Sequence, residues 1–118
     1  MKFIGYPKCS TSRKAKAWLD DHHLAYTERH IVEEALSQEE LTQLYRQSGL
    51  PLKRFFNTSG MKYRELGLKD KLKELSEEEQ LALLSTDGML VKRPILVDGE
   101  KVLVGFKEAQ WAEALLHD

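Results

Sequence analysis

A short apolar segment, a proline and a candidate helix follow one another at the start of the chain. Residues 2–6 read Lys-Phe-Ile-Gly-Tyr and are stopped by Pro7, and from Ser10 to about His22 apolar residues recur at helical spacing. The next segment, 25–31, alternates in character and is rich in strand formers. This order of strand, helix and strand predicts a βαβ unit, in which the two strands are parallel.

The middle of the chain carries two helix-start signals. The Ser-x-x-Glu pattern of a capping box occurs at 37–40 and again at 76–79. A helix is predicted to begin at each box, the first ending at 49–51 and the second near 87–88. Between these helices, the leucines and charges of 63–75 predict one helix, or two short ones interrupted at a glycine, Gly67.

The last part of the chain returns to strands. Residues 94–104 form two apolar runs around Asp98-Gly99, the pattern of a β-hairpin. Residues 107–116 predict a closing helix with these residues inward: Ala109, Ala112 and either Leu115 or Leu116.

This order of elements predicts an α/β fold with one domain over 1–118. A βαβ half followed by a ββα half is the thioredoxin-like arrangement, here expected over 1–35 and 88–118, with a helical insert over 36–87. The 118 residues are 42% hydrophobic and 31% charged, which suits a single compact domain.

Composition excludes several classes of function. A formal net charge of -1 provides no broad basic field, so direct binding of nucleic acid is not expected. No apolar run is long enough for a membrane span, and the apolar start is too short for a signal peptide, so we expect a cytoplasmic protein.

One cysteine and four histidines form no recognisable metal pattern, and the adjacent His22 and His23 are expected to complement a helix dipole. Neither a metal nor a bound cofactor is expected.

The single cysteine, Cys9, follows the first predicted strand and precedes the first helix. Ligands of open α/β sheets gather at this end of the strands. A thiolate there meets the unpaired N–H groups of a helix N-terminus, which lower the pKa of a thiol. The alternative is a buried structural cysteine. The strand-turn-helix setting favours the reactive thiol.

Several neighbours of Cys9 are expected to support the thiolate or a bound oxyanion. Cations next to it favour the charged form, and nearby hydroxyls can cap the helix or donate to the sulfur. The cations are Lys8, Arg13 and Lys14, and the hydroxyl residues are Ser10, Thr11 and Ser12.

Three segments carry a resemblance that covers nearly the whole chain. They are 7–19, which opens Pro-Lys-Cys-Ser-Thr-Ser-Arg, 55–66, which contains Phe-Phe-Asn-Thr-Ser-Gly, and 87–94, which ends Val-Lys-Arg-Pro. Together they resemble the ArsC and Spx family of thioredoxin-like proteins, in particular small bacterial proteins labelled arsenate reductase-like. The resemblance implies thiol redox chemistry at Cys9, although the family contains both reductases and a transcriptional regulator.

Two departures from the family pattern bear on the activity. Spx-type switches close a disulfide within Cys-x-x-Cys, and Ser12 stands in place of the second cysteine here, so an external thiol must resolve any adduct. ArsC-type reductases balance the oxyanion charge with a cluster of arginines. The motifs match only Arg93, and the other positions fall at Asn57 and near Gly105, which makes efficient arsenate reduction doubtful.

Arg93-Pro94 has two readings. Alone, it fits an ordinary trans proline that opens an edge strand. The resemblance implies a cis bond beside the cysteine, with a strand edge at Pro94 to which a substrate can pair.

Two functions follow from these expectations. The first is a monothiol oxidoreductase that uses Cys9 and an external glutathione-like thiol or glutaredoxin-like reductant, with a mixed disulfide or arsenate as substrate. The alternative is an Spx-like regulator that docks on the C-terminal domain of the RNA polymerase α subunit through a surface near 49–51, with Cys9 vestigial.

Overall fold

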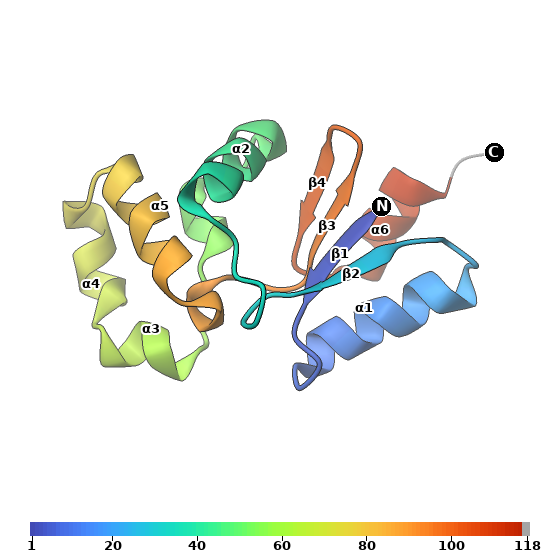
Figure 1. Ribbon diagram of the computed structural model, residues 1–118, viewed down its shortest axis with the longest axis horizontal. Coiled ribbons are helices and arrows are strands. Elements are labelled where there is room, and N and C mark those ends of the chain that lie inside the picture. The colour runs from blue at the N-terminus through green and yellow to red at the C-terminus, as the bar shows by residue number, and fades with distance from the viewer. Residues whose placement is uncertain (117–118) are drawn as a thin grey trace. The chain divides into compact units, whose positions relative to one another are not determined.

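A computed structural model describes the protein over residues 1–116, and the chain divides into two compact units. The first unit contains residues 1–30 and the chain from Arg93 onward, and the second contains residues 31–92. All strands of the sheet lie in the first unit, and the second is helical (Figure 1). Within residues 1–116, every helix is too short or too polar to span a bilayer.

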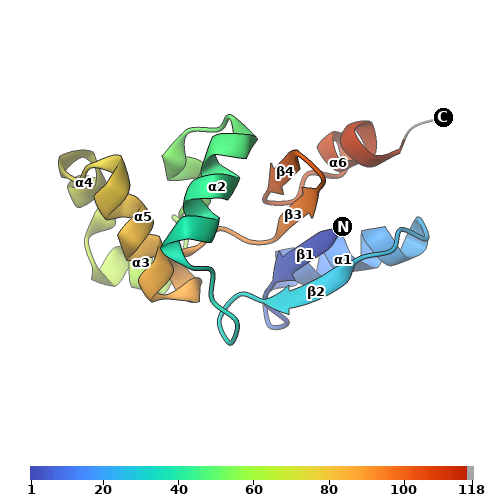
Figure 2. The same cartoon turned by 45° about the horizontal axis from the view of Figure 1, so that its top comes forward.

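The first unit contains a four-stranded sheet and two helices. Its elements are β1 (Lys2–Gly5), α1 (Ser10–Asp21), β2 (Thr27–His30), β3 (Ile95–Asp98), β4 (Lys101–Val104) and α6 (Glu108–Leu115). The strand order is β2-β1-β3-β4, with β1 parallel to β2 and antiparallel to β3, and with β3 antiparallel to β4 (Figure 2). The predicted α/β fold with a βαβ half and a ββα half is therefore confirmed.

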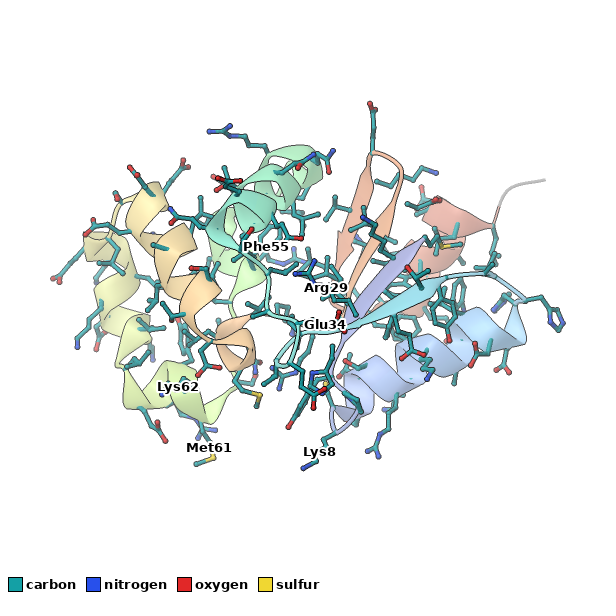
Figure 3. All side chains as sticks on the ribbon, in the orientation of Figure 1. Lys8, Arg29, Glu34, Phe55, Met61 and Lys62 are labelled. Atoms are coloured by element: carbon teal, nitrogen blue, oxygen red, sulfur yellow. The ribbon has the colours of Figure 1, made fainter. Side chains whose placement is uncertain are left out.

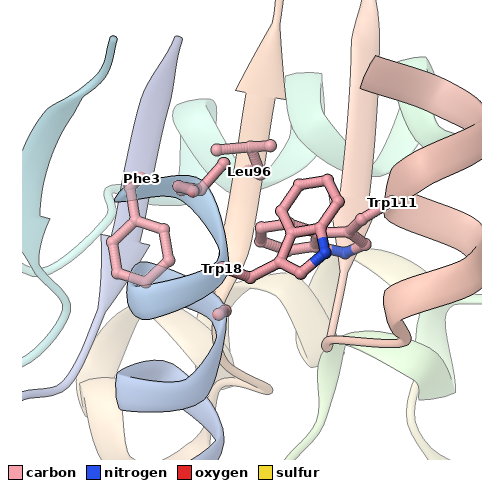
Figure 4. Packing of buried hydrophobic residues seen from close by; sticks show 6 residues of the cluster. Phe3, Trp18, Leu96 and Trp111 are labelled. Carbon is pink, nitrogen blue, oxygen red and sulfur yellow. The ribbon is translucent and has the colours of Figure 1, made fainter. Parts of the chain in front are cut away.

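The two helices of this unit share one hydrophobic core with the sheet. Trp18 of α1 and Trp111 of α6 meet edge to face, with ring centroids 6.1 Å apart, and both belong to a buried cluster with Phe3 and Leu96 (Figure 4). Phe3 and Leu96 are cross-strand partners on β1 and β3. Burial of these large side chains supplies most of the free energy that holds α1 and α6 on the sheet.

The inward face of α6 differs from the sequence prediction at one position. Ala109 was expected to face inward, but it is exposed, and the fully buried residue is Trp111. Positions two apart on a helix differ by about 200° in direction, so a face centred on Trp111 turns Ala109 to solvent. The predicted contacts of Ala112 and Leu115 with the core are confirmed.

The second unit is built from short helical elements. They are α2 (Gln38–Ser48), η1 (Leu52–Phe55), α3 (Met61–Glu65), α4 (Leu68–Lys71), η2 (Leu72–Glu74), α5 (Glu77–Thr86) and η3 (Gly88–Leu90). Helix α2 packs against α5, and the Tyr45 hydroxyl donates to Glu77 over 2.6 Å.

Local signals set the ends of these helices. Both predicted capping boxes form, so that Ser37 and Ser76 each accept the N–H of the glutamate three residues on, and that glutamate accepts theirs. Gly49 ends α2 in the left-handed conformation with φ 67°, and Gly67, with φ 63°, separates α3 from α4. The prediction of two short helices interrupted at Gly67 is confirmed.

Candidate functional site

The turn between β1 and α1 presents Cys9. The Cys9 N–H donates to the Tyr6 carbonyl over 2.9 Å, which closes the turn around Pro7 and Lys8. Cys9 is the N-cap of α1 and has extended backbone. The thiol is half-buried and is not part of a disulfide. Its sulfur is therefore available at the positive end of a helix.

Ser12 lies one turn into α1 and is the one polar residue that is buried within residues 1–116, at 3% exposure. Its Oγ accepts the Tyr6 backbone N–H over 3.2 Å, and the hydroxyl is also hydrogen-bonded to the Cys9 thiol. Because the oxygen already serves as acceptor, the hydroxyl proton is the part that can point to the sulfur.

These contacts change the acidity of the thiol. Partial burial acts to raise the pKa of Cys9, but hydrogen bonds lower it by more, so that the pKa lies below the ordinary value. In order of size these bonds come from the N–H and hydroxyl of Ser12, the Arg93 side chain and the N–H of Thr11. A larger share of Cys9 is thiolate near neutral pH than for an ordinary cysteine.

Arg93 is brought to this turn by the sheet. β1 and β3 are antiparallel neighbours, so the residue that follows β1 and the residues that precede β3 lie at the same end of this pair. The Arg93 guanidinium carbon stands 5.3 Å from the centroid of the Tyr6 ring, and the Arg93 side chain hydrogen-bonds the Cys9 thiol. The chain thus brings together two predicted site residues that are distant in sequence.

The Arg93–Pro94 peptide bond is cis, as the resemblance implied. Pro94 is fully buried, and its carbonyl accepts the N–H of Gly105 over 2.8 Å. Gly105 has φ 77°, a conformation that favours glycine. Pairing of a substrate along this strand end stays a prediction.

The cations beside Cys9 in the sequence take a smaller part than expected. Lys8 and Arg13 are exposed, and Lys8 extends away from the ribbon (Figure 3). Within residues 1–116, none of the interactions that shift the pKa of Cys9 comes from either side chain. Ser10 is exposed as well, and Thr11 acts through its backbone N–H. Close support for the thiolate therefore comes from Ser12, Thr11 and Arg93.

Tyr6 is a site residue that sequence reasoning missed, because it was read only as the end of the first strand. An aromatic residue directly before Pro7, at the carboxyl end of that strand, was the signal available. No group of three or more metal-ligating side chains occurs in the part of the chain that the structure describes. The site is thus a single thiol held among hydrogen-bond donors.

Comparison with known proteins agrees with this arrangement. The family model described as ArsC family matches residues 4–114. The chain is 62% identical over 113 residues to the uncharacterized protein YusI of Bacillus subtilis (strain 168), with 96% of each chain covered. It is 31% identical over 102 residues to the global transcriptional regulator Spx of Staphylococcus haemolyticus, covering 86% of this chain and 76% of that one.

A solved structure supports the same relationship. The crystal structure described as a possible arsenate reductase from Streptococcus mutans UA159 matches with a TM-score of 0.84 and 48% identity, over 90% of each chain. The fold is thus that of the thioredoxin-like ArsC proteins. Because the family model spans nearly the whole chain, this chain belongs to the ArsC family, and the cis bond before Pro94 agrees with what the resemblance implied.

Proposed function

We propose that the protein is a monothiol oxidoreductase that reduces mixed disulfides of small thiols. The observation that carries this proposal is the state of Cys9, a half-buried thiol at a helix N-terminus whose pKa is lowered by donors from Ser12, Arg93 and Thr11. A thiolate at ambient pH is the nucleophile that thiol–disulfide exchange requires.

The reaction balances with one cysteine and one external thiol. The Cys9 thiolate attacks one sulfur of the mixed disulfide, the S–S bond breaks, and the substrate thiolate leaves and takes a proton from water. Cys9 then carries the small thiol as a disulfide. A second glutathione-like thiolate, free or supplied by a glutaredoxin-like reductant, attacks that adduct and releases Cys9. The substrate leaves as a reduced thiol, and the small thiol that it carried ends in a disulfide with the one external thiol. Such thiols are kept reduced in the cytoplasm, which is the location we propose.

Arsenate is a weaker candidate substrate. Its charge near neutral pH calls for several cations, and among the predicted positions Arg93 is the arginine that contacts Cys9. The cation next in sequence, Lys8, is exposed and takes no part in the pKa shift. A mixed disulfide requires only an accessible sulfur, so we expect disulfide reduction to exceed arsenate reduction.

The test is reduction of a glutathionylated peptide with glutathione and glutaredoxin supplied, run beside arsenite formation from arsenate. Wild type should reduce the peptide, and Cys9→Ser should lose that activity. Met61→Ala, at a residue that is 71% exposed, serves as the control variant (Figure 3). Peptide reduction undiminished in Cys9→Ser would overturn the enzyme proposal, and faster arsenate than peptide turnover would overturn the substrate preference.

A second candidate is an Spx-like regulator, favoured by the 31% identity to Spx. In this case the protein docks on the C-terminal domain of the RNA polymerase α subunit through a surface near Gly49, Leu50 and Pro51. Gly49 and Pro51 are exposed, and Leu50 is half-buried. Capture of the purified α domain by wild type and by Cys9→Ser alike, with loss in Leu50→Glu, would support this candidate. Absence of capture by wild type would exclude it.

A further inference from the structure

Tyr6 contacts two of the residues that support the Cys9 thiolate, Ser12 and Arg93, and it also closes the cysteine turn. Its backbone N–H donates to the Ser12 hydroxyl over 3.2 Å, and its carbonyl accepts the Cys9 N–H over 2.9 Å. Its ring faces the Arg93 guanidinium, with 5.3 Å from the guanidinium carbon to the ring centroid. The first two contacts use the Tyr6 backbone and do not require a particular side chain. The contact with the Arg93 guanidinium requires an aromatic ring.

The face of an aromatic ring is a suitable platform for this cation. A guanidinium is planar and weakly hydrated, and it is attracted to the negative face of the ring. Arginine has many rotamers, so that placing its end group at one point costs conformational entropy unless a neighbour restricts it. Tyr6 follows β1 and Arg93 lies just before the antiparallel strand β3, and the ring that the guanidinium covers makes Tyr6 that neighbour.

The Tyr6 ring is itself held by a second aromatic contact. His30, at the end of β2, packs on it edge to face, with centroids 5.5 Å apart and an interplanar angle of 86°. β2 is the other neighbour of β1 in the sheet. The ring therefore packs against His30 of β2 as well as against Arg93, which limits its movement relative to Arg93.

We propose that Tyr6 is a positioning residue that holds the Arg93 guanidinium against the Cys9 sulfur. The proposal rests on the proposed function, since it concerns how the reactive thiolate is maintained. In this arrangement the ring supplies no proton and does not touch the substrate. Its effect reaches Cys9 only through Arg93.

The test measures the acidity and reactivity of the Cys9 thiol rather than the turnover of a substrate. The rate of Cys9 alkylation by iodoacetamide is followed from pH 5 to pH 10 for wild type, Tyr6→Leu, Arg93→Gln and the double variant, with urea denaturation of each to verify folding. Tyr6→Leu should raise the midpoint of the profile and slow alkylation below that midpoint by about two- to fivefold, the range of a cation–π contact. Tyr6→Phe keeps the ring and should retain the wild-type midpoint. Tyr6→Met replaces Tyr6→Leu if the latter fails to fold.

The double variant distinguishes an effect of Tyr6 that acts through Arg93 from a general loss of packing. If Tyr6 acts through Arg93, the double variant should match Arg93→Gln alone. Equal profiles for Tyr6→Leu and wild type would overturn the proposal, and so would an effect of Tyr6→Leu that persists undiminished without Arg93. A wild-type midpoint that is no lower than the pKa of an ordinary free thiol would instead count against the proposed function itself. The two failures are thus distinguishable.

Discussion

The Ser12 hydroxyl oxygen accepts the backbone N–H of Tyr6 over 3.2 Å, and this bond determines what the hydroxyl offers to Cys9. With its oxygen engaged by a donor, the hydroxyl contributes its proton to the sulfur. Ser12 stands at the position that the second cysteine of a Cys-x-x-Cys motif would occupy. In this chain the position supports the thiolate instead of resolving its disulfide.

Replacing Ser12 by alanine should make Cys9 less acidic. The variant loses the hydroxyl hydrogen bond, one of the larger contributions to the lowered pKa. Hydrogen bonds to charged groups contribute about 1.5–3 kcal/mol, so alkylation by iodoacetamide below the midpoint should slow about tenfold or more. Ser12→Thr retains a hydroxyl and is the matched control. An unchanged pH profile in Ser12→Ala would show that the hydroxyl does not act on the sulfur.

The lowered pKa of Cys9 also predicts how stability changes with pH. The folded state stabilises the Cys9 thiolate, whereas in the unfolded chain the thiol has its ordinary pKa of 9.0. The stabilisation is therefore fully present above pH 9.0 and is lost as pH falls through the folded-state pKa. The free energy of unfolding of wild type relative to Cys9→Ser should rise from pH 6 to pH 9 in urea titrations. A difference that stays flat over this range would contradict the lowered pKa.

Introducing a second thiol at Ser12 should create an oxidisable pair. In Ser12→Cys the two sulfurs are separated by one helical turn at the start of α1, the spacing of a Cys-x-x-Cys motif. On mild oxidation both free thiols should disappear while the protein remains a monomer on a non-reducing gel. Persistence of both thiols would argue against this geometry, and a covalent dimer would indicate that the sulfurs react between molecules.

The indole of Trp111 links α6 to Gly105, the residue that follows β4. Its Nε1–H donates to the Gly105 carbonyl over 3.1 Å, and the Gly105 N–H donates to the Pro94 carbonyl. Trp111→Phe would leave a buried carbonyl without this donor and reduce packing against Trp18. A loss of about 1–3 kcal/mol in the free energy of unfolding is expected from urea titration. Wild-type stability in this variant would show that the indole N–H contributes little.

Gly88 lies where two segments of the second unit come into close backbone contact. A Cβ at this position would stand 2.1 Å from the Ile31 carbonyl oxygen, so one of the two segments must shift in Gly88→Ala. The expected cost is about 1–3 kcal/mol or more. Gly49→Ala is the comparison, because that site has open space around a positive φ and should cost only about 1 kcal/mol. Equal losses in both variants would refute the steric explanation.

The short-range features of this protein could be predicted from the sequence because their causes are local. Ser37 and Ser76 cap their helices with groups three residues away, and Gly67 interrupts the chain between α3 and α4 through its own conformation. The strand-turn-helix that presents Cys9 follows from Pro7 and helical periodicity. The cis bond before Pro94 was expected only from the resemblance to a family.

Tertiary structure decided which of the cations lies beside the thiol. Lys8 and Arg13 are neighbours of Cys9 in sequence but are exposed, whereas Arg93 reaches the sulfur because β3, which it precedes, pairs with β1, which leads into the cysteine turn. The inward face of α6 was decided in the same way, by the space beside Trp18 that Trp111 fills. Charge and periodicity are properties of the sequence, but the direction and burial of a side chain depend on strand pairing and packing between segments far apart in the chain.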